Sequence, residues 1–552
     1  MEQARLLIAI VLSALVFLVW QFFFVDREAD QKIAKKTTEK PAQTEQVQSA
    51  EPYAAEQKNA STETPGVTQP AATARQITIE TALYTAKISE KGAGFSSFVL
   101  KNYREDVSED SALKEIIPQE GAPESVLIGY DGKSIDGLEN SVFSVNLNTD
   151  AIDVKTASEK VTFSWQSSQG VVIEKTYSFE PDSYMIGLDI TVKNGSDRSL
   201  QDKLYISLVG KVSADARAYG FEGPSALING DLEEVDIDDI ADKSTYPGSL
   251  KWVTVQDRYF MTSVIPIQVE EATMRLFTRE NNLVEAHYLN PVSDIRPGTQ
   301  HTYQYALFFG PRSSQILGEV GHDLAKALNF GFFDVIAKPC VWLMNKLYSV
   351  IPNYGIAIII LTLLIKIVLW PLGSKSYKSM SEMKKIQPLM KEIREKNKDD
   401  KKKMNEEVMG LYRTYKINPL GGCLPMVVQL PVFFALYRML YQAIELRHAP
   451  FFLWIDDLSA PDRLGRFAID HIPFMEPPYG IPVLTLIMGA SMILQQKMSP
   501  PMGDPTQAKM MMFMPVIFTV IFINFSSGLV LYWLVNNILS IAQQYYIQKK
   551  YA

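Results

Sequence analysis

The sequence predicts a multi-domain membrane protein: an α-helical bundle of six transmembrane helices (an N-terminal anchor plus a five-helix core) with a large antiparallel β-sandwich outside the membrane. Three observations lead to this prediction. Apolar runs of about twenty residues, the length that a bilayer-spanning helix needs, recur at the N-terminus and in the last third of the chain. A long region between them has the two-residue periodicity of half-buried strands. Lysine and arginine gather on one side of the predicted spans.

Length and composition limit the classes of protein to which the chain can belong. With 552 residues and 47% hydrophobic residues, the chain is long enough for several domains and too polar to be a membrane bundle throughout. Its two cysteines, Cys340 and Cys423, rule out a disulfide framework. No zinc-protease, α/β-hydrolase or P-loop motif is present, and no predicted span has an interior Asp or Glu. We therefore expect no enzyme, no metal site and no cofactor.

The N-terminal part is predicted to tether the rest. Residues 1–26 form a transmembrane anchor, because Leu6–Val25 is apolar throughout. A cleaved signal peptide is the alternative, but no small-x-small cleavage site follows the run. Residues 27–75 contain almost no large apolar side chains, so we expect a flexible linker.

Residues 76–320 are predicted to form the β-sandwich. Alternating apolar and polar residues mark strands in the segments Val142–Leu147, Val161–Trp165, Thr176–Phe179 and Leu188–Val192. The aromatic residues of this region are expected to fill the core and its rim, with a ligand cleft as the alternative; they include Trp165, Tyr177, Trp252 and Tyr259.

The remaining chain is predicted to be helical. Residues 321–351 mix aromatic, apolar and lysine residues as an amphipathic interfacial helix region, which Pro339 is expected to break into two pieces. Residues 352–552 form the five-helix core, including a cytoplasmic helical hairpin at 374–416. The predicted spans are 352–371, 419–444, 479–496, 510–525 and 529–547.

The basic hairpin predicts how the chain is oriented across the membrane. Residues 374–416 hold thirteen basic and seven acidic residues, so the positive-inside rule places this face and both termini in the cytoplasm and the sandwich outside. Two apolar stripes, one with Met383 and Met390 and one with Val408 and Leu411, predict that its two arms pair. Its lysines form either a docking surface for a ribosome or other anionic partner, or a surface for lipid headgroups; the candidates are Lys384, Lys385, Lys401, Lys402 and Lys403.

Lys366 is the most informative single residue. A lysine at the centre of a bilayer costs roughly 3 kcal/mol or more, so this one either extends to the nearby interface or faces a wet cavity. Polar residues in the cytoplasmic halves of several spans favour a polar groove, and helix-to-helix hydrogen bonding is the alternative. These residues include Thr362, Gln429, Gln496, and on the last span Trp533, Asn536, Asn537, Ser540 and Gln544.

Two other functional classes use the same features. A solute transporter or channel also needs a charged intramembrane residue, but the outer halves of the spans are nearly all apolar and no internal repeat is visible. An assembly chaperone that does not insert anything would have the same groove, and the sequence does not distinguish it from an insertase.

Five segments resemble the YidC/Oxa/Alb family of membrane-protein insertases, in its Gram-negative form with a large periplasmic domain. They are NPLGGCLPMVVQLPVFFALYRML at 418–440, FFLWIDDLSAPD at 451–462, QQKMSPP at 495–501, MMFMPVIFTVIF at 511–522 and SSGLVLYWLVNN at 526–537. The match extends over the whole chain, although the outer domain matches mainly by size and position.

The resemblance implies a groove that is open to cytoplasm and lipid and closed to the outside, in a protein of the bacterial inner membrane. Lys366 stands where many relatives have arginine, so the positive charge is kept and the bidentate geometry is lost. Implied partners are nascent membrane-protein substrates, the ribosome, the Sec translocon and the lipid bilayer, with no DNA. A substrate's apolar segment is expected to slide along Phe433, Met514 and Phe518.

Overall fold

The computed structural model describes residues 74–213, 220–398, 400–415, 424–465, 467, 471–498 and 505–551. The predicted anchor, nearly all of the predicted linker and Cys423 lie outside these residues. Arg75, which the prediction assigned to the linker, already belongs to the β-sheet region, because its side chain donates to the carbonyl oxygen of Leu147 (2.8 Å) and pairs with Asp150.

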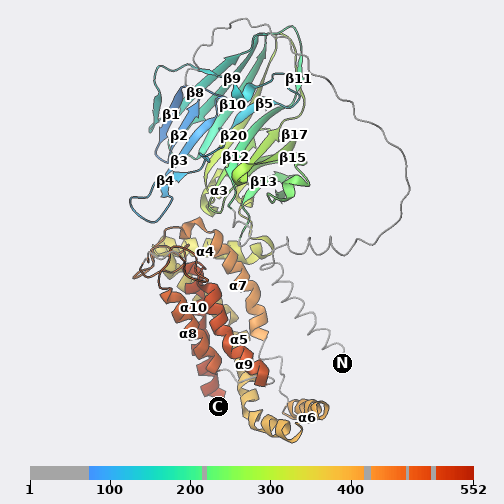
Figure 1. The fold of residues 1–552 in the computed structure, drawn as a ribbon, viewed down its shortest axis with the longest axis vertical. Helices are drawn as coiled ribbons and strands as arrows, with labels where there is room; N and C mark the ends of the chain where they lie inside the picture. The colour runs from blue at the N-terminus through green and yellow to red at the C-terminus, as the bar shows by residue number, and fades with distance from the viewer. Residues whose placement is uncertain are drawn as a thin grey trace, which may run out of the picture. The chain divides into compact units, whose positions relative to one another are not determined.

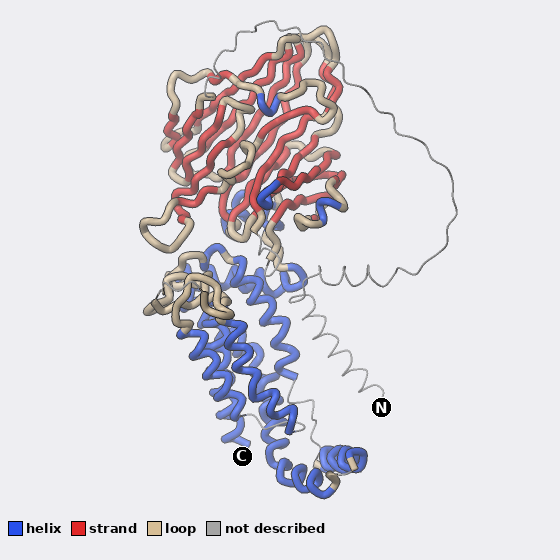
Figure 2. Tube along the Cα trace, viewed as in Figure 1, coloured by secondary structure: helices blue, strands red, loops and turns tan. Residues whose placement is uncertain are grey.

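Strands occupy the described chain up to residue 311 and helices dominate after it (Figures 1 and 2). The strands are β1 (Gln76–Thr81), β2 (Tyr84–Ser89), β3 (Phe95–Arg104), β4 (Leu113–Glu115), β5 (Leu127–Tyr130), β6 (Ser144–Val145), β7 (Ala151–Val154), β8 (Glu159–Gln166), β9 (Val171–Phe179), β10 (Met185–Asn194), β11 (Leu200–Asp202), β12 (Leu204–Lys211), β13 (Gly223–Ile228), β14 (Asp231–Glu234), β15 (Thr245–Gln256), β16 (Phe260–Pro266), β17 (Glu271–Arg279), β18 (Leu283–Leu289), β19 (Ser293–Ile295) and β20 (Gln300–Pro311).

The strands form two main sheets, as the predicted sandwich requires. One has five strands in the order β4-β3-β2-β1-β7, and the other has the order β5-β12-β18-β17-β15-β16-β20-β10-β9-β8-β6, with β13 and β14 attached. The pairing is antiparallel except between β1 and β7, which run parallel. The prediction of an entirely antiparallel sandwich is therefore wrong for this pair. The predicted strand at Val142–Leu147 shrinks to the two residues of β6.

Aromatic rings join the two sheets. Phe98 on β3 stacks on Phe309 of β20, with 4.9 Å between ring centroids, and Phe95 meets Tyr177 of β9 at 5.3 Å. Tyr177 and Trp252 are fully buried, so these predicted aromatics fill the core. Burying a large side chain of this kind contributes about 2–3 kcal/mol, which explains why the two faces stay together.

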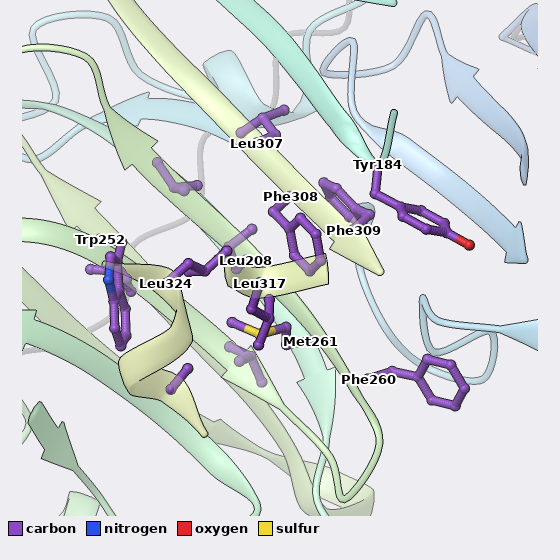
Figure 3. Packing of buried hydrophobic residues seen from close by; sticks show 14 of the residues in the cluster. Tyr184, Leu208, Trp252, Phe260, Met261, Leu307, Phe308, Phe309, Leu317 and Leu324 are labelled. Atoms are coloured by element: carbon purple, nitrogen blue, oxygen red, sulfur yellow. The ribbon is translucent and has the colours of Figure 1, made fainter. Parts of the chain in front are cut away.

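The described residues contain eight α-helices and six short 3-10 helices. They are η1 (Leu138–Asn140), η3 (Asp239–Ala241), η4 (Glu280–Asn282), α3 (Ser314–Val320), η5 (Leu324–Ala327), η6 (Gly331–Phe333), α4 (Asp334–Val350), α5 (Tyr354–Lys396), α6 (Lys401–Thr414), α7 (Leu424–Gln442), η8 (Ile444–Leu446), α8 (Val483–Met498), α9 (Pro505–Phe522) and α10 (Ser527–Tyr551). Leu317 of α3 and Leu324 of η5 pack against Leu208, Met261 and Trp252 of the large sheet (Figure 3).

The predicted helix break at Pro339 is wrong, and the helix of the second predicted span extends beyond Pro371. Helix α4 passes through Pro339, and α5, which is 43 residues long, passes through Pro371, so the hairpin's first arm extends the predicted second span. A proline inside a helix removes one N–H donor and disturbs one turn, and packing of the surrounding helix compensates for that loss. Helix α4 buries Ala337 and Met344 and exposes the apolar side chains of Val335 and Trp342.

A helix coincides with each of the five predicted core spans, with ends that differ by a few residues except at the C-terminal end of α5, which extends to Lys396. By length and composition, α5 is the one described helix that is long and apolar enough to cross a membrane; α8 and the Met512–Phe522 part of α9 are shorter apolar helices. The number of membrane crossings therefore stays a prediction.

A buried lysine holds the interior of the sandwich together. Lys175 on β9 is fully buried, and its Nζ donates to the carbonyl oxygens of Gly92 (3.1 Å), Ala93 (2.8 Å) and Val126 (2.8 Å). Burial lowers the pKa of this amine well below its usual value. The three acceptor residues all have positive φ, which is strained for a β-branched residue such as Val126. The lysine therefore links the strained backbone of two loops to β9.

Replacing this lysine tests its role. In Lys175→Met three buried carbonyl oxygens lose their hydrogen-bond donor. Each loss lowers the free energy of unfolding by about 1–3 kcal/mol. We expect amide exchange in the full-length protein to accelerate roughly 100-fold or more in β9 and around Val126. Lys160→Met, on the neighbouring strand β8 with an exposed side chain, is the matched control. Equal protection of both variants in hydrogen-exchange mass spectrometry would remove the assigned role.

Candidate functional site

The helical region encloses a polar pocket between α5, α7 and α10. Its cavity volume is about 40 Å³, which is space for a few water molecules. Helix α5 contributes Thr362, Lys366 and Tyr377, α7 contributes Gln429, and α10 contributes Tyr532, Asn536 and Gln543 to its lining. Three helices that are distant in sequence thus place amide, hydroxyl and ammonium groups around one small space.

Local sequence explains why α5 reaches this position. Asn353 begins the helix, because its side chain accepts a hydrogen bond from the backbone N–H of Ile356 at 3.0 Å. Further along, Gly373 permits close approach to α10: a Cβ atom at that position would lie 3.0 Å from Nε2 of Gln543. The same Nε2 atom donates to the carbonyl oxygen of Trp370 (3.1 Å), which links α5 and α10 next to the pocket.

Lys366 is the charged group of the pocket. Its Nζ donates to Oγ of Ser540 (2.6 Å) and to Oδ1 of Asn536 (3.4 Å), both on α10. The side chain is half-buried and lines the pocket, which favours the pocket-facing alternative over extension to the membrane interface. No carboxylate lies among the described residues that line the pocket. The ammonium group is therefore solvated by neutral groups.

The other polar residues of the pocket hydrogen-bond across and along the helices. Gln429 forms a side-chain hydrogen bond with Tyr532, joining α7 to α10. Tyr377 forms side-chain hydrogen bonds with Ser540 and with Gln495 of α8. Thr362 lines the pocket but donates its hydroxyl to the carbonyl oxygen of Ile358 in its own helix (2.7 Å).

Helix α10 separates two residues that the sequence placed together. Asn536 lines the pocket, whereas Asn537 is 4% exposed and donates to Oγ of Ser491 on α8 (3.1 Å). Successive helical residues differ by about 100° around the axis, which explains the separation. Asn537 thus makes the helix-to-helix hydrogen bond that the sequence analysis kept as the alternative.

Two further predicted groove residues also lie elsewhere. Trp533 faces aromatic rings, with its centroid 4.7 Å from that of Phe433 and 5.0 Å from that of Phe522, and it does not line the pocket. Gln496 does not line the pocket either, and its neighbour Gln495 contacts Tyr377 instead. The sequence showed the polar stripe but not the direction in which each member points.

The predicted sliding surface divides into buried and exposed parts. Phe433 and Phe518 both contact the Trp533 ring, at centroid distances of 4.7 and 6.2 Å. Met514 is 44% exposed and continues an exposed apolar face of α9 with Phe513 and Ile517. The two phenylalanines are thus half-buried around Trp533, whereas Met514 is exposed.

The hairpin has the predicted pairing. Met383, Ile386 and Met390 of α5 form a small buried cluster against Val408 and Leu411 of α6. At the turn, the side chain of Asp400 caps α6 through the N–H of Lys403 (3.0 Å). Four of the five predicted contact lysines have exposed side chains, and the side chain of Lys401 lies outside the described part; the four are Lys384, Lys385, Lys402 and Lys403.

Comparison with known proteins gives matches over nearly the whole chain. The family model of the YidC periplasmic domain matches residues 76–343, and that of the 60Kd inner membrane protein matches residues 346–552. A membrane protein insertase YidC from Syntrophus aciditrophicus is 40% identical over 559 residues, covering 99% of each chain. The corresponding protein from Syntrophobacter fumaroxidans is 39% identical over 561 residues, covering 99% of this chain and 100% of the relative.

Among solved structures, the chain is similar to a crystal structure of an active YidC insertase whose first transmembrane domain is resolved. The identity is 20%, the match covers 86% of this chain and 92% of that one, and the TM-score is 0.37. The family assignment rests on the sequence matches.

The two adjacent asparagines of α10 offer a test of the pocket. In a background without Cys340 and Cys423, we expect Asn536→Cys to react with a charged, membrane-impermeant thiol reagent at least roughly tenfold faster than Asn537→Cys. The reason is that residue 536 lines the cavity and residue 537 is packed against α8. The measurement is the labelling rate in membranes, and equal rates would contradict the assigned orientation of α10.

Proposed function

The chain belongs to the YidC family of membrane protein insertases, and we propose that it transfers membrane-protein segments into the bilayer by way of the pocket between α5, α7 and α10. The observation that carries this proposal is the environment of Lys366. Its ammonium group contacts Ser540 and Asn536 and lies beside a cavity whose described lining contains no carboxylate. The pocket therefore has one positive charge available for a negative group that enters it.

An acidic residue in the polar flank of a substrate would supply that group. A carboxylate about 4 Å from an ammonium group gains about 4 kcal/mol at an effective dielectric constant of about 20. That gain offsets part of the cost of moving the flank away from water. The hydroxyl and amide groups of Ser540, Asn536 and Gln429 then solvate the remaining polar atoms of the flank.

The apolar segment of the substrate takes a different route. We place it along the exposed face of α9 that includes Met514, supported from inside by Phe433 and Phe518. Burial of apolar surface contributes about 25 cal/mol per Å², so transfer into lipid is favourable without nucleotide hydrolysis. Methionine side chains adapt to many apolar shapes, which suits a surface that meets varied sequences. The proposed activity is thus insertion and assistance of folding, without bond chemistry.

The family places the protein in the inner membrane with its β-sandwich in the periplasm. To this we add six membrane-spanning helices with both termini in the cytoplasm. The support is the basic hairpin at the far end of α5 and the lysines at the end of α10, which the positive-inside rule assigns to the cytoplasm.

Nascent membrane proteins are the substrates of this family. We further propose the ribosome and the Sec translocon as partners, with the hairpin as the ribosome-facing surface. Its exposed lysines supply the positive charge that an RNA surface would attract.

Charge matching between Lys366 and the substrate tests the proposal. Lys366→Gln should lower insertion of a reporter with an acidic translocated flank by roughly tenfold, a change of about 1.4 kcal/mol, and should hardly affect a reporter with a neutral flank. Lys366→Arg should restore the acidic reporter. Insertion is measured by protease protection in proteoliposomes, with the exposed Lys375→Gln on the same helix as the control. Unchanged insertion of the acidic reporter in Lys366→Gln would refute the role of the charge.

The hairpin has its own test. We expect the double variant Lys384→Glu, Lys385→Glu to weaken cosedimentation with translating ribosomes by roughly tenfold, since two attractive charges become repulsive. The effect should shrink at high salt. The double variant Lys549→Glu, Lys550→Glu, at the end of α10, is the control. Retained ribosome binding together with lost binding to anionic vesicles would assign the hairpin to lipid headgroups instead.

A further inference from the structure

The β-sheet region contains a cleft that the insertion mechanism does not use. Its volume is about 770 Å³, within the range of roughly 300–1,000 Å³ that is typical of ligand sites. The floor is the face of three adjacent strands, β12, β18 and β17. The opposite wall comes from the chain around Lys91, the loop 118–124 and η1.

Strand register brings the floor residues together. Ser207 pairs with His287, and Glu285 pairs with Phe277. Residues paired across antiparallel strands share a face, and so do residues two apart on one strand. Tyr205, Ser207, Glu285, His287, Phe277 and Arg279 therefore project from one face, and all six line the cleft.

A charged group at the centre of this floor is held in place from two sides. Oε1 of Glu285 lies 2.6 Å from Nε2 of His287, and Oε2 accepts a hydrogen bond from Nε of Arg279 at 2.7 Å. Glu285 and His287 are 7% and 8% exposed. Burial by itself raises the pKa of Glu285, but the hydrogen bonds and charges of His287 and Arg279 outweigh it and lower that pKa. The carboxylate is thus fixed in one geometry and ionised.

Aromatic rings surround this group. The Tyr205 ring stacks on His287 with 4.3 Å between centroids and an angle of 7° between planes, and Phe277 approaches the same imidazole at 4.8 Å. Phe277 is 40% exposed, so one of its faces is open to the cleft. The floor combines an apolar ring surface with fixed acceptors and donors in its interior.

From this arrangement we propose that the cleft binds a neutral, hydroxyl-rich ligand, a saccharide chain. The C–H faces of sugar rings match an exposed aromatic face, and sugar hydroxyls both donate to Glu285 and accept from Arg279. The cleft does not favour an ionic ligand, because its lining carries charges of both signs. The positive residues are Lys91 and Arg279, and the negative residues are Glu124, Glu139 and Glu285.

An extended peptide fits the floor less well. Peptides that bind to sheets pair with a free strand edge. Here β18 is hydrogen-bonded to β12 on one side and to β17 on the other, so the floor offers side chains and no free backbone edge. The proposal is independent of the insertion mechanism, because every residue of the cleft belongs to the β-sheet region.

Saturation-transfer NMR on the full-length protein in lipid nanodiscs tests this proposal. The probes are cellotetraose, chitotetraose and a neutral decapeptide. We expect transfer from the protein to ring protons of at least one oligosaccharide, reduced roughly tenfold in Phe277→Ala and in Glu285→Gln. Ile267→Ala, which removes an exposed apolar side chain outside the cleft, should behave like the unaltered protein.

Thermal unfolding of each variant shows whether it is folded. Phe277→Ala is the decisive variant, because the Phe277 side chain is partly exposed and forms no ion pair. Three results would overturn the proposal. They are no transfer to either oligosaccharide at millimolar concentration, transfer that persists in folded Phe277→Ala, and transfer to the decapeptide alone.

Discussion

The placement of one ammonium group among apolar helices constrains the whole helical region. Around Lys366, helix α5 presents exposed apolar side chains, among them Leu363, Ile367 and Val368. A charge in such a helix needs polar partners at close range, and α10 supplies them with Ser540 and Asn536. The polar stripe of α10 and its contact with α5 are consequences of this requirement.

A second buried lysine shows how differently the same side chain serves the β-sandwich. Lys175 meets three carbonyl oxygens, and it joins two strained loops to β9. Lys366 has two hydroxyl or amide partners and a cavity beside it. The first arrangement leaves no donor for a ligand and stabilises the fold. The second leaves room for an incoming group, which is what a transfer site needs.

Patterns of local residues predicted much of this protein, because helix and strand periodicity follow from backbone geometry. The hairpin is an example: two apolar stripes led to the cluster of Met383, Met390 and Leu411. Predictions from single prolines were less reliable. Pro339 was predicted to break a helix and Pro371 to end a span, yet both helices continue, since contacts outside the local sequence compensate for one missing hydrogen bond.

The sequence by itself determined the periodic elements, the charge asymmetry of the helical region and the family to which the chain belongs. Only the tertiary structure decided which side chains share a site. On α10 a difference of one residue, about 100° around the axis, separates Asn536 in the pocket from Asn537 against α8. In the β-sandwich, the pairing of β12 with β18 stacks the Tyr205 ring on His287 across more than eighty residues of chain. Both outcomes depend on neighbours that are distant in sequence, which local periodicity does not encode.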